Sequence, residues 1–289
     1  MDYREHRYMS ACGQLELFAR DYPAAGNGDV PSLLLMHGLT RNSGDFEPLA
    51  ARLAGDYRLI VPDMRGRGLS QYDPDPSQYR PDVYAADMFA LLQSLGIGHP
   101  GLIGTSMGGL IAMVMNAMKP GTFPGIVFND VGPVLDVEGL GRIGSYVGSE
   151  KAFPDWDSAA KACSAINASA FPDYKDTDWQ AWARRTCSEL PDGRVTFAYD
   201  PAIADSLGDV DEQPQPDLWP LWDALGDTPV LVIRGALSDL LAADTVSEMR
   251  RRHRGSFMHV DVPNRGHAPM LDEPSSLAAI SDFLGEHLR

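Results

Sequence analysis

The feature that most constrains the fold is a ten-residue stretch, Gly101-Leu102-Ile103-Gly104-Thr105-Ser106-Met107-Gly108-Gly109-Leu110. An apolar run enters a G-x-S-x-G pattern centred on Ser106, and an apolar segment compatible with a helix follows it to Met118. This order predicts a strand, a sharp turn that presents the serine at the strand end, and a helix. Glycines two residues before and two residues after the serine let the strand and helix backbones approach without a Cβ clash.

Short apolar runs recur along the chain with helical stretches between them, which predicts a mostly parallel sheet covered on both faces. The runs do not alternate with polar residues, as expected for strands that are buried on both sides. The clearest of them predict strands at residues 32–37, 58–62, 101–105, 125–129, 229–234 and 258–262. Residues 5–11 and 14–21 predict an antiparallel pair, which brings the expected sheet to eight strands. Helices are expected at residues 45–54, 81–95, 106–118, 218–225, 241–253 and 273–288.

The rhythm of strands and helices breaks between residues 133 and 216, where proline-interrupted helical pieces carry Trp156, Trp179 and Trp182. A stretch of this length is too long for a simple loop in a compact domain. We therefore predict an inserted helical lid at residues 133–216 and a core domain formed by residues 1–132 and 217–289. The three tryptophans are candidates for lining a substrate pocket, and an equally strong interpretation makes them the core of the small lid helices.

The composition excludes several classes of protein. A net charge of −16 disfavours nucleic acids and anionic membranes as partners. No apolar run approaches the roughly 18 residues of a membrane span, and the N-terminus lacks the apolar stretch of a signal peptide. Three scattered cysteines without a C-x-x-C pattern indicate neither a disulfide framework nor a zinc site, so we expect a cytoplasmic protein without metal or cofactor. The oligomeric state stays open, with a homo-oligomer among the alternatives.

A serine hydroxyl needs a general base to become a nucleophile, and the base needs an acid to orient it. His267 lies in a loop after the last predicted strand and is the candidate base. Asp239 and Asp130 each follow a buried strand and are the candidate acids. Because the carboxyl ends of parallel strands share one edge of a sheet, these side chains can converge on Ser106. His37 is a rival base, but its position before the serine favours a structural role at its strand end, beside the substrate pocket.

The charge that develops when an acyl group is attacked needs backbone N–H donors in place. Met107 directly follows the candidate nucleophile and begins the helix, so its N–H is one candidate. The second is expected in the loop after the strand at residues 32–37, where Gly38 permits a turn and Leu39 offers its N–H.

Five ordered motifs resemble those of α/β-hydrolase-fold proteins over nearly the full chain. They are His37-Gly38-Leu39-Thr40, the segment from Pro62 to Ser70 with its D-x-R-G-x-G pattern, the Ser106 turn, Arg234-Gly235-Ala236-Leu237-Ser238-Asp239, and Gly266-His267-Ala268-Pro269. The resemblance implies the order Ser, Asp, His for a catalytic triad. Some family members place the acid after the strand that precedes Asp130. The R-G-x-x-S-D context is typical of the acid, so we favour Asp239, with Asp130 as a strand-end carboxylate that binds local N–H groups.

The resemblance implies a serine hydrolase of a small carboxylic ester or lactone, acting through an acyl-enzyme with Ser106, His267 and Asp239. Carbon–carbon bond hydrolases of aromatic ring cleavage and cofactor-free haloperoxidases share the same constellation and remain alternatives. The oxyanion segment Gly38-Leu39-Thr40-Arg41 lacks the extra glycines of the carbon–carbon branch, which favours the ester or lactone. A small-molecule receptor that retains the triad is the alternative from another class of protein. The fold does not specify the substrate.

Overall fold

Eight strands form one twisted, mostly parallel sheet in the computed structural model, which describes residues 2–24, 30–149, 152–206 and 216–288. Their order across the sheet is β1 (Arg4–Met9), β2 (Glu16–Tyr22), β4 (Arg58–Asp63), β3 (Ser32–Met36), β5 (Gly101–Thr105), β6 (Ile126–Asn129), β10 (Val230–Gly235) and β11 (Phe257–Val262). The first two strands pair antiparallel, and β2 joins β4 antiparallel, while all other neighbours are parallel. The predicted α/β-hydrolase architecture of the sheet is confirmed, with boundaries that differ by a few residues.

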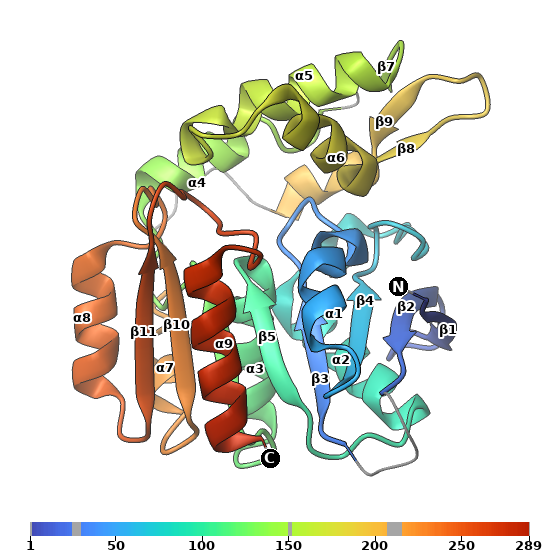
Figure 1. Ribbon diagram of the computed structural model, residues 1–289. Coiled ribbons are helices and arrows are strands. Elements are labelled where there is room, and N and C mark those ends of the chain that lie inside the picture. The colour runs from blue at the N-terminus through green and yellow to red at the C-terminus, as the bar shows by residue number, and fades with distance from the viewer. Residues whose placement is uncertain (1, 25–29, 150–151, 207–215, 289) are drawn as a thin grey trace.

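Helices cover both faces of this sheet (Figure 1). One face packs against α1 (Glu47–Leu53) and α9 (Pro274–His287). The other face packs against α2 (Pro81–Ser94), α3 (Met107–Met118), α7 (Trp219–Asp223) and α8 (Ala243–Arg252). The central strands are buried from both sides, which explains why their sequences are continuous apolar runs rather than alternating ones.

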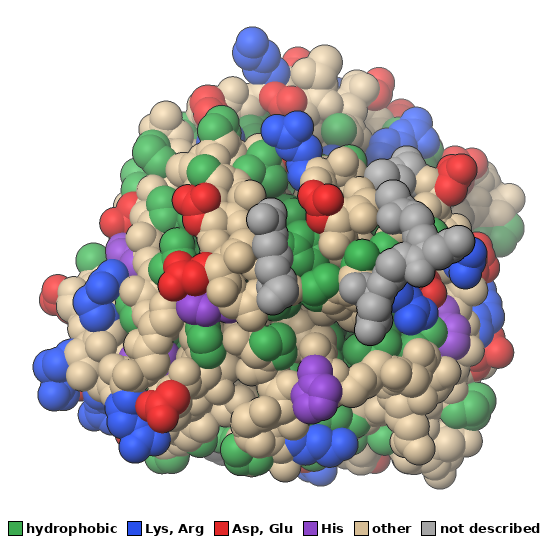
Figure 2. Space-filling model, turned by 60° about the horizontal axis from the view of Figure 1, so that its bottom comes forward, with side chains coloured by type: hydrophobic (Ala, Val, Ile, Leu, Met, Phe, Trp, Pro, Cys, Tyr) green, Lys and Arg blue, Asp and Glu red, His purple; other side chains and the backbone are tan. Residues whose placement is uncertain are grey.

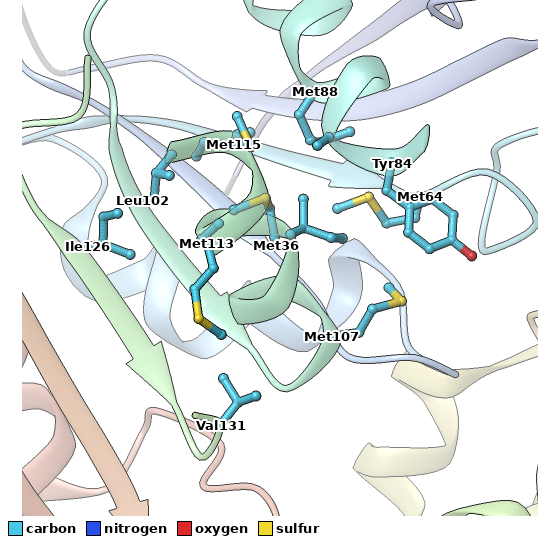
Figure 3. Close-up of a cluster of buried hydrophobic side chains, with 14 of the residues drawn as sticks. Met36, Met64, Tyr84, Met88, Leu102, Met107, Met113, Met115, Ile126 and Val131 are labelled. Atoms are coloured by element: carbon cyan, nitrogen blue, oxygen red, sulfur yellow. The ribbon is translucent and has the colours of Figure 1, made fainter. Parts of the chain in front are cut away.

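Methionines fill much of the core around α3, the helix that follows Ser106 (Figure 3). Met107, Met113 and Met115 are buried there, where unbranched and polarizable side chains adapt to irregular gaps. Met118 continues the apolar pattern of the helix but lies outside this core, because it is 50% exposed at the end of the helix. The well-packed N-terminal part of α3 therefore fixes the helix relative to the sheet close to the serine.

The segment of residues 133–216, here called the insert, lies above the carboxyl ends of the strands in Figure 1. Its residues 150–151 and 207–215 lie outside the described part of the chain. Its described elements are α4 (Val137–Gly144), β7 (Ala152–Phe153), α5 (Trp156–Asn167), a 3₁₀ turn (Ala168–Ala170), α6 (Asp176–Thr186), β8 (Cys187–Glu189), β9 (Val195–Phe197) and a second 3₁₀ turn (Pro201–Ser206). The three short strands form a separate sheet, and the insert has a small apolar core of its own.

Charged side chains of both signs are interspersed on the face turned forward in Figure 2, which brings the bottom of Figure 1 toward the viewer. The net negative charge is therefore not gathered into one patch on that face. Within the described residues, no helix combines the length and the apolar character that crossing a membrane requires.

Candidate active site

Ser106 occupies the sharp turn between β5 and α3, with a backbone φ of 51° in the left-handed region. A non-glycine residue in this region is strained, and such strain persists where the surrounding structure enforces it. The flanking glycines allow the geometry: a Cβ on Gly104 would collide with Gly108, and a Cβ on Gly108 would collide with the carbonyl of Met36. The strand and the helix therefore approach as closely as the sequence pattern predicted, and the turn presents the hydroxyl at the strand end.

A continuous hydrogen-bonded chain runs from this serine through a histidine to an aspartate. His267 Nε2 lies 2.9 Å from Ser106 Oγ, and His267 Nδ1 lies 2.8 Å from Asp130 Oδ2. Asp130 is fully buried and has a φ of 54°, while the side chain of His267 is 8% exposed. The geometry fits a nucleophile, a base and an orienting acid, and it brings together two of the three residues proposed from the sequence.

Asp239, the acid favoured from the sequence, forms no hydrogen bond with His267. Its carboxylate accepts two hydrogen bonds from Arg142 of α4, from Nε at 2.5 Å and from Nη2 at 3.0 Å. Partial burial acts to raise the pKa of Asp239, but the hydrogen bonds and charge of Arg142 hold that pKa below its usual value. The choice of Asp239 is therefore corrected: Asp130 is the carboxylate on His267, and Asp239 joins the insert to the core.

The β10 segment that suggested Asp239 instead holds Asp130 in place. The backbone N–H of Gly235 donates to Asp130 Oδ1 at 2.7 Å, and the Ser238 hydroxyl donates to Asp130 Oδ2 at 2.6 Å. The Ser238 oxygen also accepts the N–H groups of Leu240 and Leu241, which leaves its proton for the carboxylate. The sequence analysis did not predict that Gly235 and Ser238 bind Asp130. Both residues belong to the R-G-A-L-S-D motif, so the motif could have indicated this contact if it had been related to Asp130 rather than to Asp239.

His37 is fully buried just after β3, and both of its ring nitrogens form hydrogen bonds to the backbone. Its Nε2 accepts the backbone N–H of Met64 at 3.0 Å, so Nδ1 carries the proton and donates to the carbonyl of Gly38 at 2.7 Å. Burial lowers the pKa of His37 to about 4, which keeps the imidazole neutral. These bonds fix the loop that carries Leu39, and the ring borders the cavity beside Ser106.

The two backbone donors proposed for an oxyanion hole remain available. Neither the N–H of Leu39 nor that of Met107 donates a hydrogen bond within the described residues. The Leu39 peptide is fixed from its other side, because Arg67 Nε donates to the Leu39 carbonyl at 2.9 Å. Met107 begins α3, where the helix dipole adds to the attraction for negative charge.

A cavity of about 90 Å³ opens above Ser106, whereas a single water needs only about 10–15 Å³. The loop after β3, the end of β5, the His267 loop and the insert all contribute to its walls. Of the three candidate tryptophans, Trp182 lines this cavity and the other two do not belong to its described lining. Trp179 packs against Phe171 and Trp182 in the core of the insert, and Trp156 donates its N–H to Glu189. The pocket role expected for Trp156 and Trp179 was therefore wrong.

Among the described residues, no group of three or more His, Cys, Asp or Glu side chains is placed to hold a metal ion.

Comparisons with known proteins agree with this fold. The model of the Alpha/beta hydrolase family matches residues 33–280, and the chain belongs to that family. A 3-hydroxybutyrate-oligomer hydrolase of Cupriavidus necator is 35% identical over 260 residues, with 87% of each chain covered. A 2-(acetamidomethylene)succinate hydrolase of Mesorhizobium japonicum is 29% identical over 259 residues, with 89% of each covered. The crystal structure of an alpha/beta hydrolase from Novosphingobium aromaticivorans superposes with a TM-score of 0.91 at 43% identity, covering 98% of each chain. These relatives support the prediction of a hydrolase.

Proposed function

We propose that the protein is a serine hydrolase that cleaves small carboxylic esters through an acyl-enzyme, with Ser106 as nucleophile, His267 as base and Asp130 as orienting acid. The single observation that carries the proposal is the chain of two hydrogen bonds, 2.9 Å and 2.8 Å long, that ends at a serine in a strained turn beneath a cavity. This is the arrangement in which a histidine can remove the serine proton as the ester carbon is attacked.

The reaction divides among these groups as follows. His267 Nε2 takes the proton from Ser106 Oγ as the oxygen attacks the ester carbonyl, and then gives it to the departing alcohol oxygen. Asp130 holds the Nδ1–H tautomer and stabilises the imidazolium that forms. The N–H groups of Leu39 and Met107 bind the oxyanion, and a water activated by His267 then releases the acid from the acyl-enzyme.

Short hydroxy-acid esters are the proposed substrate class, with oligomers of 3-hydroxybutyrate as the first candidate. The relative from Cupriavidus necator supports this choice, because its name specifies that substrate and it is similar over 87% of the chain. The cavity supports it too: apolar side chains of Ile143 and Met270 share its wall with polar groups such as Asn167 and Thr186. Lactones of the same acids belong in the same panel, since they present the same acyl carbon.

The insert is proposed to act as a lid over this site. Its residues Ile143, Cys163 and Trp182 line the same cavity as Ser106, so closure above the serine would exclude water and strengthen the oxyanion contacts. Trp182→Ala should change the preference among p-nitrophenyl acetate, butyrate and hexanoate more than it changes turnover of the acetate. Trp156→Ala is the matched control outside the cavity, and an equal change in both variants would contradict the lid assignment.

Labelling with a fluorophosphonate and mass spectrometry tests the proposed function. The reagent should modify Ser106, and Ser106→Ala should lower kcat for 3-hydroxybutyrate dimer and p-nitrophenyl butyrate by on the order of 10⁴ or more, because triad members act as a unit. Ser77→Ala, an exposed serine away from the cavity, is the control and should keep full activity. Modification of another serine, or of none, would overturn the assignment.

A further inference from the structure

We infer that Arg41 binds a carboxylate of the substrate and thereby selects esters that carry a free acid group. The inference rests on the proposed function, because it assigns a specificity-determining residue to the same cavity. Arg41 follows the oxyanion loop and lines the cavity together with Ser106. Gly38 separates the two residues: a Cβ placed on it would lie 3.6 Å from Arg41 Cγ and 3.8 Å from Ser106 Cβ. The arginine side chain therefore starts beside the proposed nucleophile.

The guanidinium of Arg41 is held rigidly in a largely buried position. Its side chain is 14% exposed, and its Cζ lies over the ring of Trp182, 4.0 Å from the ring centroid. Nε donates to Asp45 Oδ2 at 2.6 Å, and Nη2 donates to Asp45 Oδ1 at 2.5 Å. An arginine fixed on two sides loses little further freedom when a ligand binds, so the remaining donors are preorganised.

One nitrogen of this guanidinium, Nη1, has no acceptor among the described residues. Both oxygens of Asp45 accept from the other two nitrogens, Nε and Nη2. Burial acts against the charged form, but the charge and hydrogen bonds of Asp45 raise the pKa of Arg41 above its usual value. The side chain therefore stays cationic, and its Nη1 donors are left for water or a ligand that carries an acceptor.

A carboxylate is the acceptor that these donors fit best. Hydrogen bonds between a guanidinium and an anionic oxygen are about twice as strong as neutral ones, and the planar fork of arginine matches carboxylate geometry. The titratable groups near Arg41 include Asp45, Tyr146, Cys163, Cys187 and the neutral His37, and Asp45 supplies the fixed negative charge among them. An oligomer of a hydroxy acid ends in a carboxylate, whereas its methyl ester does not, so the two forms differ in the group that Arg41 would bind.

The experiment compares kcat/KM for 3-hydroxybutyrate dimer with kcat/KM for its methyl ester. The wild-type protein should prefer the free acid, and Arg41→Met should lower the acid-to-methyl-ester ratio by about 10- to 100-fold, mainly through KM, because a hydrogen bond to a charged group is lost. Arg41→Lys should keep an intermediate ratio, since the charge remains but the fork is lost.

Arg184→Met is the matched control, since Arg184 stacks on Trp156 at 3.9 Å and belongs to the insert but not to the described lining of the cavity. Its ratio should equal that of the wild type. The inference is overturned if the wild type has no preference for the acid, or if Arg41→Met leaves the ratio unchanged. If the inference fails but Ser106 is still labelled and neutral esters are still cleaved, the proposed function stands and only the role of Arg41 as a carboxylate site is lost. Absence of both labelling and ester cleavage would overturn the proposed function and this inference with it.

Discussion

Two aspartates follow neighbouring strands of the same sheet, and the structure gives them opposite roles. Asp130, after β6, is fully buried and accepts from Gly235, Ser238 and His267. Asp239, after β10, is 25% exposed and pairs with Arg142 of the insert. A carboxylate surrounded by fixed donors on the core can orient a histidine, whereas one bound by a guanidinium of another segment holds that segment in place.

The difference follows from strand order. In the sheet, β6 lies directly beside β5, and Thr105 is paired with Asn129, so the residues after them, Ser106 and Asp130, lie at the same level. The turn after β10 is one strand further from the serine. The Asp239 loop therefore reaches the site through Ser238, which contacts Asp130, while its own carboxylate lies within reach of α4.

The largest difference between Asp130 and Asp239 is expected when each is replaced by asparagine and the activities of the two variants are compared. Asp130→Asn should lower kcat/KM for p-nitrophenyl butyrate by about 10³- to 10⁴-fold, because an amide no longer holds the Nδ1–H tautomer or stabilises the imidazolium. Asp239→Asn should change it by no more than about fivefold, as expected for a residue outside the proton path. Steady-state kinetics on both variants decides which of the two aspartates orients His267. Loss of activity in Asp239→Asn with retention in Asp130→Asn would restore the assignment made from the sequence.

Ser238 offers a finer test of the same comparison, because it belongs to the Asp239 loop but contacts Asp130. Ser238→Ala should reduce kcat by roughly 10-fold, since removing a hydrogen bond to a buried charge costs about 1.5–3 kcal/mol and part of that loss falls on the transition state. In the Asp130→Asn background the same change should have almost no further effect, because the two residues act as one unit. Additive losses in the double variant would show that Ser238 acts independently of Asp130.

The smallest effect is expected at the ion pair between Arg142 and Asp239. A double-mutant cycle with Arg142→Met and Asp239→Asn, measured by urea unfolding at pH 7, should give a coupling free energy of about 1 kcal/mol, because solvent screens a partly exposed pair. The pKa of Asp239 is depressed in the folded protein, so this stabilisation is present above the unfolded-state pKa of about 3.9 and is lost as pH falls through the lower, folded value. The coupling free energy should be the same at pH 7 and pH 5. A marked decline from pH 7 to pH 5 would contradict a depressed pKa for Asp239.

Much of the fold could be predicted from local sequence. The apolar runs predicted the six strands that pair parallel in the main sheet, because burial on both faces leaves a pattern that does not depend on distant residues. The antiparallel pair at the edge and the helices that cover the sheet were also predicted. Ser106 and His267 could be proposed for a similar reason. The glycines around Ser106 encode a close approach that no other residue permits, as the collisions of a Cβ at Gly104 and Gly108 confirm.

The errors share one physical origin. Trp156 and Trp179 carry the same residue type in the same kind of helix as Trp182, and a sequence gives no indication of which face of a small helix turns toward a cavity. Met118 continues the apolar pattern of α3 but lies past the edge of the packed core. Arg41 and Arg142 are ordinary polar residues in the sequence, and their importance comes from the partners, Asp45 and Asp239, that the fold brings to them.

The sequence by itself determined the family, the strand-turn-helix that presents Ser106, and the proposed base, His267, because each depends on short-range constraints of backbone space and residue type. Tertiary structure alone decided which carboxylate meets the base. Asp130 and Asp239 are equivalent strand-end residues in the sequence, and strand order, register and the position of Arg142 made one the partner of His267 and the other an anchor for the insert. Hydrogen bonds act over about 3 Å, so long-range packing, which a linear pattern does not record, selects their partners.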